Sequence, residues 1–221
     1  MPRLPRRHLV HEGSFNHCTW RGHNHSFVLG SDEEKRRFLD LVHEAKGRFG
    51  IRVLSYCLMN SHPHLVVQSL RGQQAFSNFW KVVNHRFARW YNHRAGRTGQ
   101  VVMDRLASPQ IQTGRHQLVA ICYGDSNPVR AGIVRSPKDW PWSSYRHYAF
   151  GEPNPLVDDS PEYLALGRTA PERRRAYRML FAAPAVDELR IRRRDLVRGP
   201  FIGEEWWVQQ QVAATAPPAP S

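Results

Sequence analysis

The spacing of apolar and polar residues along the chain predicts an alternation of strands and helices. Three short, largely apolar runs at 15–20, 52–59 and 62–68 have the length of strands. Two longer segments, at about 32–49 and 73–93, carry apolar residues every three or four positions, which is the spacing of one face of a helix. The chain therefore begins as strand, helix, two strands and helix.

The first predicted helix has signals at both of its ends. Ser31 is suited to be the N-cap, and Glu34 stands where a carboxylate reaches back to the N-cap backbone in a capping box. Gly50 follows the last apolar position and favours termination, because glycine readily adopts the left-handed conformation that ends many helices.

Further along the chain, short strands are predicted at 101–103 and 109–112, followed by a third helix at about 114–125. The Gly-Asp-Ser sequence at 124–126, which directly follows Tyr123, consists of weak helix formers. This order of elements indicates an α+β fold, with a ferredoxin-like or RRM-like antiparallel sheet and helices on one of its faces.

Towards its C-terminus the chain changes in composition, because prolines become frequent and arginines cluster. We predict a main domain at 14–150, preceded by a basic lead-in at 1–13 and followed by a small, basic helical extension at 151–208. Residues 209–221 are rich in alanine, proline and glutamine and predict a disordered tail.

The net charge of the chain indicates a class of binding partner. The 221 residues contain 32 lysines and arginines against 19 aspartates and glutamates, a formal net charge of +13. A protein with this balance most often binds a polyanion, and nucleic acid is the leading candidate. The alternative is a basic surface that serves solubility alone.

The cysteines and the N-terminal segment indicate the cellular compartment of the protein. Cys18, Cys57 and Cys122 are an odd number, widely spaced and without a CxxC pair, which favours reduced thiols in a cytoplasm. The basic start is not followed by an apolar signal segment, and no apolar run is long enough to span a membrane. We therefore expect a soluble cytoplasmic protein.

Two histidines provide the first candidate chemistry. His62 and His64 stand one residue apart in a predicted strand, where side chains two positions apart point to the same face. Two imidazoles side by side form half of a site for a divalent cation. The pattern alone also fits a hydrogen-bonded structural pair.

Tyr123 and Asn127 provide the second candidate. They are four positions apart in the predicted helical region, so they share a helix face and could serve as nucleophile and metal ligand. A phenol has a pKa of about 10 in water, so a nearby cation would have to favour loss of its proton. The spacing alone favours a plainer interpretation, with Tyr123 as a core aromatic and Asn127 as a helix-end cap.

Four segments form an ordered set of motifs: 56–67 (YCLMNSHPHLVV), 84–92 (NHRFARWYN), 126–134 (SNPVRAGIV) and 139–146 (DWPWSSYR). Together they strongly resemble the REP-associated tyrosine transposases, which are single-strand HUH transposases of the insertion-sequence-200-like superfamily. The resemblance covers about 14–150 and suggests a continuation to about residue 207. The chain departs from that family's usual pattern at Pro63, between the histidines, and at Gly124, after the tyrosine.

The resemblance implies a reaction and a role for each residue. His62, His64 and Asn127 would hold a divalent metal, Mg²⁺ or Mn²⁺, and Tyr123 would be the nucleophile. The implied activity is that of a transposase or nickase, which cleaves and rejoins single-stranded DNA beside palindromic hairpins through a 5′-phosphotyrosine. Because the histidines must be neutral to bind a metal, we expect activity to fall as the pH drops through about 6.5.

A set of arginines is predicted to contact this DNA, and some of them are equally compatible with a solvated helix face. They are Arg21, Arg86, Arg89, Arg94, Arg97 and Arg105.

Two rival functions remain at this point. One is a catalytically inactive, repurposed protein that binds DNA or RNA hairpins. The other is a metallohydrolase, which the lack of an HExxH motif disfavours. The implied location is cytoplasmic, with the bacterial nucleoid, and the oligomeric state stays open between monomer and homodimer.

Overall fold

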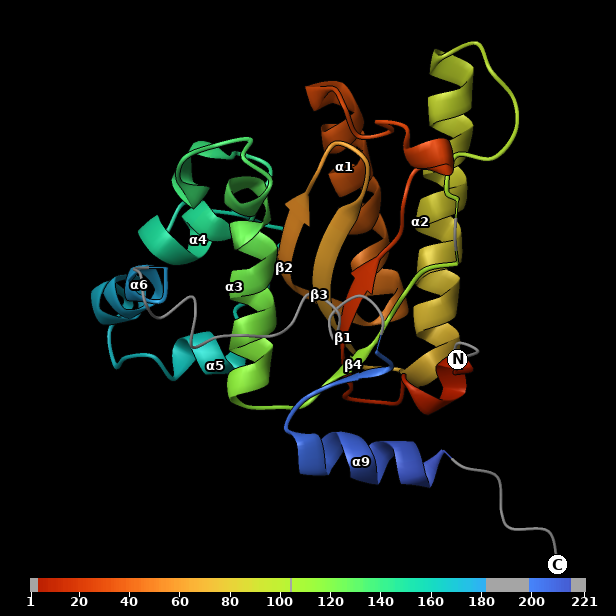
Figure 1. Cartoon of the computed structure of the whole chain (residues 1–221). Coiled ribbons are helices and arrows are strands. Elements are labelled where there is room, and N and C mark those ends of the chain that lie inside the picture. The colour runs from red at the N-terminus through yellow and green to blue at the C-terminus, as the bar shows by residue number, and fades with distance from the viewer. Residues whose placement is uncertain (1–3, 104, 182–198, 216–221) are drawn as a thin grey trace, which may run out of the picture.

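Strands from distant parts of the chain form one mixed sheet (Figure 1). The computed structural model describes residues 4–103, 105–181 and 199–215, and within these the sheet has five strands in the order β2-β3-β1-β4-β5. The strands are β1 (Phe15–Thr19), β2 (Ile51–Leu58), β3 (Pro63–Ser69), β4 (Gln110–Ile111) and β5 (Phe201–Ile202). The first four pair antiparallel, whereas β4 and β5 pair parallel.

Helices cover both faces of this sheet (Figure 1). Two long helices, α1 (Asp32–Phe49) and α2 (Gly72–Arg94), pack against one face, and α3 (Arg115–Arg130) packs against β2 and β3 from the other. The other helices and 3₁₀ turns of the described residues are η1 (Arg6–His8), η2 (His23–His25), η3 (Pro137–Asp139), α4 (Tyr145–Phe150), α5 (Pro161–Leu164), α6 (Ala170–Met179) and α9 (Glu205–Ala214).

The α+β class and the helical C-terminal region are confirmed, and strands β1 to β4 follow the ferredoxin-like order. Two details of the prediction were wrong. The sheet is mixed, not antiparallel, because the chain returns at β5 to run parallel to β4. Helices cover both faces because both carry apolar side chains. Phe15, Val66 and Ile111 point away from α1 and α2 and need a cover of their own.

The ends of α1 follow the sequence signals. The Ser31 side chain accepts a hydrogen bond from the Glu34 backbone N–H at 3.2 Å, and the Glu34 carboxylate accepts one from the Ser31 N–H at 2.7 Å. At the other end Gly50 has a φ of +62°, the left-handed conformation that glycine adopts without strain. The capping box and its terminating glycine are confirmed.

Helix α3 is longer than predicted. It continues through Gly124 and ends at Arg130, instead of stopping near Asp125. Tertiary contacts outweigh the weak local propensity, because the Asp125 carboxylate is fully buried and accepts hydrogen bonds from Tyr177 at 2.7 Å and from Ser144 at 3.1 Å. This carboxylate ties the middle of α3 to the segments beyond it.

The region after α3 closes over the outer side of that helix. Four tyrosines of α4, α5 and α6 pack together against it in a tyrosine cluster. They are Tyr145, Tyr148, Tyr163 and Tyr177. The predicted extension therefore forms part of the cover on this face of the sheet.

Near the C-terminus, α9 continues as a helix to Ala214, where the composition predicts a disordered tail from residue 209. The alanines and glutamines of this stretch are good helix formers, which explains the difference. Part of the predicted arginine-rich extension, 182–198, lies outside the described residues, as do 1–3 and 216–221.

The free edge of β2 is covered by the segment at 142–158. The Leu58 N–H donates to the Trp142 carbonyl at 2.8 Å, and the Asp158 N–H donates to the Val53 carbonyl at 2.7 Å. The Asp158 carboxylate also accepts a hydrogen bond from the Val53 N–H at 2.9 Å. In the part of the chain that the structure describes, no helix is long and apolar enough to cross a membrane.

Candidate active site

His62 and His64 lie at the start of β3, with their ring centroids 4.8 Å apart. His62 immediately precedes the strand and is half-buried, and His64 lies within it and is 4% exposed. Pro63 stands between them as the first residue of the strand, where a missing N–H is tolerated. The predicted pair of neighbouring imidazoles is therefore compatible with the proline.

A third histidine, His17, joins them from β1. In the antiparallel register His17 faces Val66, which places it diagonally beside His64 on the side of the sheet that α3 covers. The His17 Nε2 and His64 Nδ1 atoms are 3.0 Å apart, and the two rings stack with centroids 5.2 Å apart. The sequence prediction missed His17, although its alternation in the first strand could have assigned it to this face.

The surroundings of His64 keep its ring neutral. Burial, followed by the nearby charges of His17, His62, Arg21 and Arg130, holds the pKa of His64 well below its usual value. The Nδ1 atom is hydrogen-bonded to His17, so Nε2 is the nitrogen with which His64 would bind a metal. Because His64 stays neutral to lower pH, its protonation should reduce activity only below the pH of about 6.5 expected from the sequence.

Helix α3 brings Tyr123 to the same place. The Tyr123 ring lies edge-on to those of His64 and His17, with centroid distances of 6.2 Å and 6.5 Å. Its side chain is 8% exposed. Residues far apart in the sequence, on β1, β3 and α3, therefore meet on one side of the sheet.

Asn127 follows Tyr123 one helical turn later and is half-buried. Because α3 continues to Arg130, Asn127 is inside the helix and does not act as its cap. Its Nδ2 atom is buried and has no hydrogen-bond partner among the described residues. A buried amide without a partner is uncommon and suggests a role outside the fold itself.

Arg130 supplies a cation beside the tyrosine. Its guanidinium carbon lies 4.5 Å from the centroid of the Tyr123 ring. The contact is a cation–π interaction, in which the positive charge lies over the face of the aromatic ring. Arg130 belongs to one of the sequence motifs, but the sequence prediction gave it no role.

His62, His64 and Asn127 offer two imidazole nitrogens and one amide oxygen, which are donor types that bind divalent metals. Imidazole and amide donors are compatible with Mn²⁺ and Mg²⁺, and water or substrate oxygens complete such sites. Within the described residues, no group of three His, Cys, Asp or Glu side chains is arranged to hold a metal. His17 is a hydrogen-bond partner of His64, with its Nε2 3.0 Å from the His64 Nδ1.

The arginines predicted to contact DNA do not lie together. Arg21 is close enough to His64 for its charge to lower the pKa of that histidine. Three others extend from α2, on the opposite face of the sheet, and two follow that helix. These five are Arg86, Arg89, Arg94, Arg97 and Arg105.

Comparison with known proteins gives a match to one family model and a similar fold. Residues 13–104 match the family model described as "Transposase IS200 like". This match includes His62 and His64 and ends before α3, which carries Tyr123 and Asn127. No curated protein matches the chain.

Seven chains of solved structures match this one. Among them is the REP-associated tyrosine transposase bound to a REP hairpin, with 18% sequence identity and a TM-score of 0.58. The match covers 72% of this chain and 93% of that one. At this identity the likeness concerns the fold.

Proposed function

Because residues 13–104 match the family model described as "Transposase IS200 like", we propose that the protein cleaves and rejoins single-stranded DNA. The proposed substrate carries palindromic hairpins, since the transposase of similar fold is bound to a REP hairpin. The main domain at 14–150 would hold the chemistry. A cytoplasmic location, with the DNA of a bacterial nucleoid, belongs to the same proposal.

One observation supports this function most. A candidate nucleophile on α3 lies beside a candidate metal ligand on β3, with the rings of Tyr123 and His64 6.2 Å apart. Neither sequence segment forms such a site alone. Their meeting on one side of the sheet is what a tyrosine nucleophile and a metal-assisted phosphate would require.

In the proposed reaction the Tyr123 oxygen attacks the scissile phosphorus. A bond forms between phosphorus and the tyrosine oxygen, and the bond to the 3′ oxygen breaks. In the net balance, the proton lost by the phenol is gained by the 3′-hydroxyl that is released. Rejoining is the reverse attack by a 3′-hydroxyl, and no energy source is needed because a phosphate ester is kept throughout.

Each remaining residue of the site has a role in this proposal. His62, His64 and Asn127 would hold the divalent metal, which when bound supplies positive charge to the phosphate oxygens. The guanidinium of Arg130, 4.5 Å from the centroid of the Tyr123 ring, would hold that ring in place and add positive charge near the phosphate. His17 would hold the His64 ring in place through the hydrogen bond of 3.0 Å.

Incubation with end-labelled single-stranded DNA that contains a palindrome, in the presence of Mg²⁺ or Mn²⁺, tests the function. We expect a covalent protein–DNA adduct on a denaturing gel, which chelation of the metal prevents. Tyr123→Phe should remove the adduct and keep hairpin binding. The matched control Tyr91→Phe, in the half-buried part of α2, should leave the adduct unchanged. Binding by the parent protein without any adduct would contradict the proposal.

A second candidate is a catalytically silent protein that binds hairpins of DNA or RNA. The observation that favours it is the burial of Tyr123, whose side chain is 8% exposed. The same assay separates the two functions, because the second one gives binding without an adduct.

A further inference from the structure

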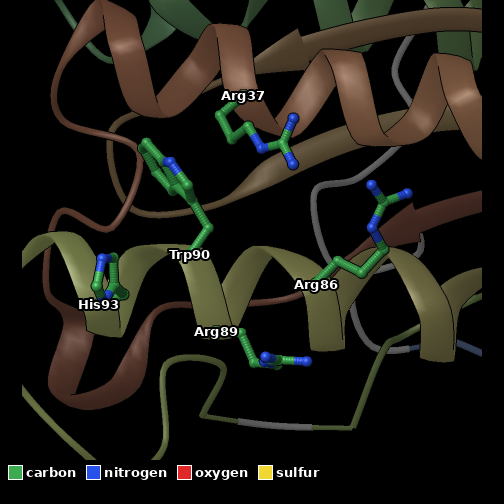
Figure 2. Close-up of a pocket in the computed structure, with 5 residues that line it drawn as sticks. All are labelled: Arg37, Arg86, Arg89, Trp90 and His93. Atoms are coloured by element: carbon green, nitrogen blue, oxygen red, sulfur yellow. The ribbon is translucent and has the colours of Figure 1, made fainter.

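A basic pocket lies between α1 and α2, on the face of the sheet opposite Tyr123 (Figure 2). Its volume is about 290 Å³, near the lower end of the roughly 300–1,000 Å³ that small-molecule sites occupy. It is lined by Arg37, Arg86, Arg89, Trp90 and His93. The pocket is the right size for part of a nucleotide and too small for a duplex.

The pocket carries an excess of positive charge. Glu44 forms ion pairs with Arg86 at 2.7 Å and with Arg37 at 3.7 Å, so one carboxylate serves two guanidinium groups. The side chains of Arg89 and His93 form no hydrogen bond or ion pair with any residue that the structure describes. At least one guanidinium is therefore uncompensated and available to an anion.

Arg37 has an unmet hydrogen-bonding requirement at the same place. Its Nε atom is buried and has no hydrogen-bond partner among the described residues. Leaving such a donor without a partner is unfavourable, so an anionic ligand that reorients the guanidinium would be stabilised. Guanidinium groups bind phosphate oxygens in pairs through their planar N–H groups, which makes phosphate the anion of choice.

Trp90 gives the basic pocket an aromatic side chain. Its half-buried ring extends from α2 towards α1, and the Arg37 side chain extends from α1 towards Arg86 (Figure 2). The centroid of the Trp90 ring lies 6.0 Å from that of Phe87 and 5.7 Å from the guanidinium carbon of Arg94. In sites that bind single-stranded nucleic acid, bases stack on aromatic side chains and phosphates contact basic groups such as guanidinium. A paired base in a duplex has no free face to offer.

The neighbouring predicted DNA contacts are already engaged within the protein. Arg94 pairs with Glu33 at 2.7 Å and Glu34 at 3.4 Å, and Arg97 donates to the Gln100 carbonyl at 2.9 Å. Among the arginines of α2 predicted to contact DNA, Arg89 is therefore the one that pairs with no carboxylate of the described residues.

We infer that the pocket is a second contact for single-stranded DNA, with a phosphate against Arg37, Arg86 and Arg89 and a base against Trp90. This inference rests on the proposed function for its substrate. The single strand that flanks a hairpin would pass from the Tyr123 side of the sheet around to the layer of α1 and α2. The pocket would thus select substrates that have a single-stranded flank.

Fluorescence anisotropy with two labelled DNAs tests this inference at about 150 mM salt. One DNA is a hairpin with a single-stranded flank of about ten nucleotides, and the other is the same hairpin with a blunt end. We expect Arg89→Ala to weaken binding of the flanked hairpin roughly fivefold or more and binding of the blunt hairpin less than twofold. Trp90→Leu should do the same, with thermal unfolding used to confirm that the variant is folded.

Arg175→Ala is the matched control, because it removes the same charge from an exposed position on α6. It should change the binding of either DNA less than about twofold. Equal losses for Arg89→Ala and Arg175→Ala would overturn the inference, because the effect would then be one of net charge. Equal losses for the flanked and blunt hairpins would also overturn it and assign the pocket to duplex binding.

These outcomes are separate from those of the cleavage assay. A covalent adduct together with unchanged binding by Arg89→Ala would reject the pocket and keep the transposase function. Weakened binding of the flanked hairpin without any adduct would keep the pocket and reject catalysis. A parent protein that binds neither DNA would overturn the pocket as a DNA contact.

Discussion

The two faces of the sheet are built from different chemistry. The face under α1 and α2 is filled with fully buried apolar side chains such as Phe38, Phe76 and Phe79. The face under α3 buries polar groups as well, among them His17 and Asp125, both 0% exposed. Apolar packing needs only volume and shape, whereas each buried polar group needs a specific partner.

This difference separates stability from function in the molecule. On the α3 side two of the buried polar groups are held by a specific partner: His64 by His17, and Asp125 by Tyr177. Such contacts fix the orientation of side chains at a cost in solvation, which is what a reactive site requires. The candidate chemistry therefore lies on the polar face, and the apolar face provides the support.

The largest effect is expected on the apolar face. Phe38→Ala should lower the free energy of unfolding by about 3–5 kcal/mol, because it removes a fully buried ring and leaves a cavity. Urea unfolding measures this loss. A destabilisation below about 1 kcal/mol would mean that this face does not provide the main support.

Asp125, on the α3 side, should make the free energy of unfolding depend on pH. Burial raises the pKa of Asp125 to about 7 despite its hydrogen bonds from Tyr177 and Ser144. Because the pKa of Asp125 is higher in the folded than in the unfolded chain, its protonated carboxyl stabilises the fold. This contribution is complete below about pH 4 and is lost as the pH rises towards 7. The loss amounts to up to about 4 kcal/mol.

Asp125→Asn should remove this dependence, since an amide can still accept from the Tyr177 hydroxyl and does not ionise. Urea unfolding at pH 5 and at pH 8 compares the variant with the parent, so that titrations common to both cancel. Equal pH dependence in the two proteins would show that Asp125 does not titrate in this range.

The His17 contact should appear in metal binding. His17→Phe removes the hydrogen bond to His64 and should weaken Mn²⁺ binding about 10–100-fold, as measured by isothermal titration calorimetry without DNA. His17→Asn, whose amide can partly replace the bond, should lose less affinity. His43→Phe, at an exposed position on α1, is the control. Unchanged affinity in His17→Phe would limit His17 to a packing role.

The smallest effect compares a glycine on each side of the sheet. Gly124 in α3 and Gly47 in α1 both have no atom within 4 Å of an added Cβ. Replacing either by alanine should therefore stabilise its helix by up to about 1 kcal/mol. Only Gly124→Ala should alter the rate of adduct formation, because only that helix carries Tyr123. A change of similar size in the rate of adduct formation for Gly47→Ala would show that the effect is not specific to the helix that carries Tyr123.

The apolar face was largely predictable from the sequence. The helical spacing at 32–49 and the capping box at Ser31 and Glu34 are local signals, and the structure confirms both. The strands at the centre of the sheet followed from short apolar runs in the same way. Local patterns suffice where burial of apolar side chains decides the structure.

The polar face was only partly predictable. His62 and His64 are adjacent in sequence and were found, but the contact of His17 with His64 depends on the register between β1 and β3. The extent of α3 depends on the hydrogen bond from Tyr177 to Asp125, which joins distant segments. A single sequence gives no local sign of such long-range contacts.

The segment at 142–158 has a consequence for assembly. Strands at the border of a sheet offer unpaired backbone groups to neighbouring molecules, and this is how many proteins join edge to edge. Here the chain has already bonded to Val53 and Leu58 along the border strand β2. A second copy cannot extend the sheet past that strand, so a homodimer would have to be built on another surface.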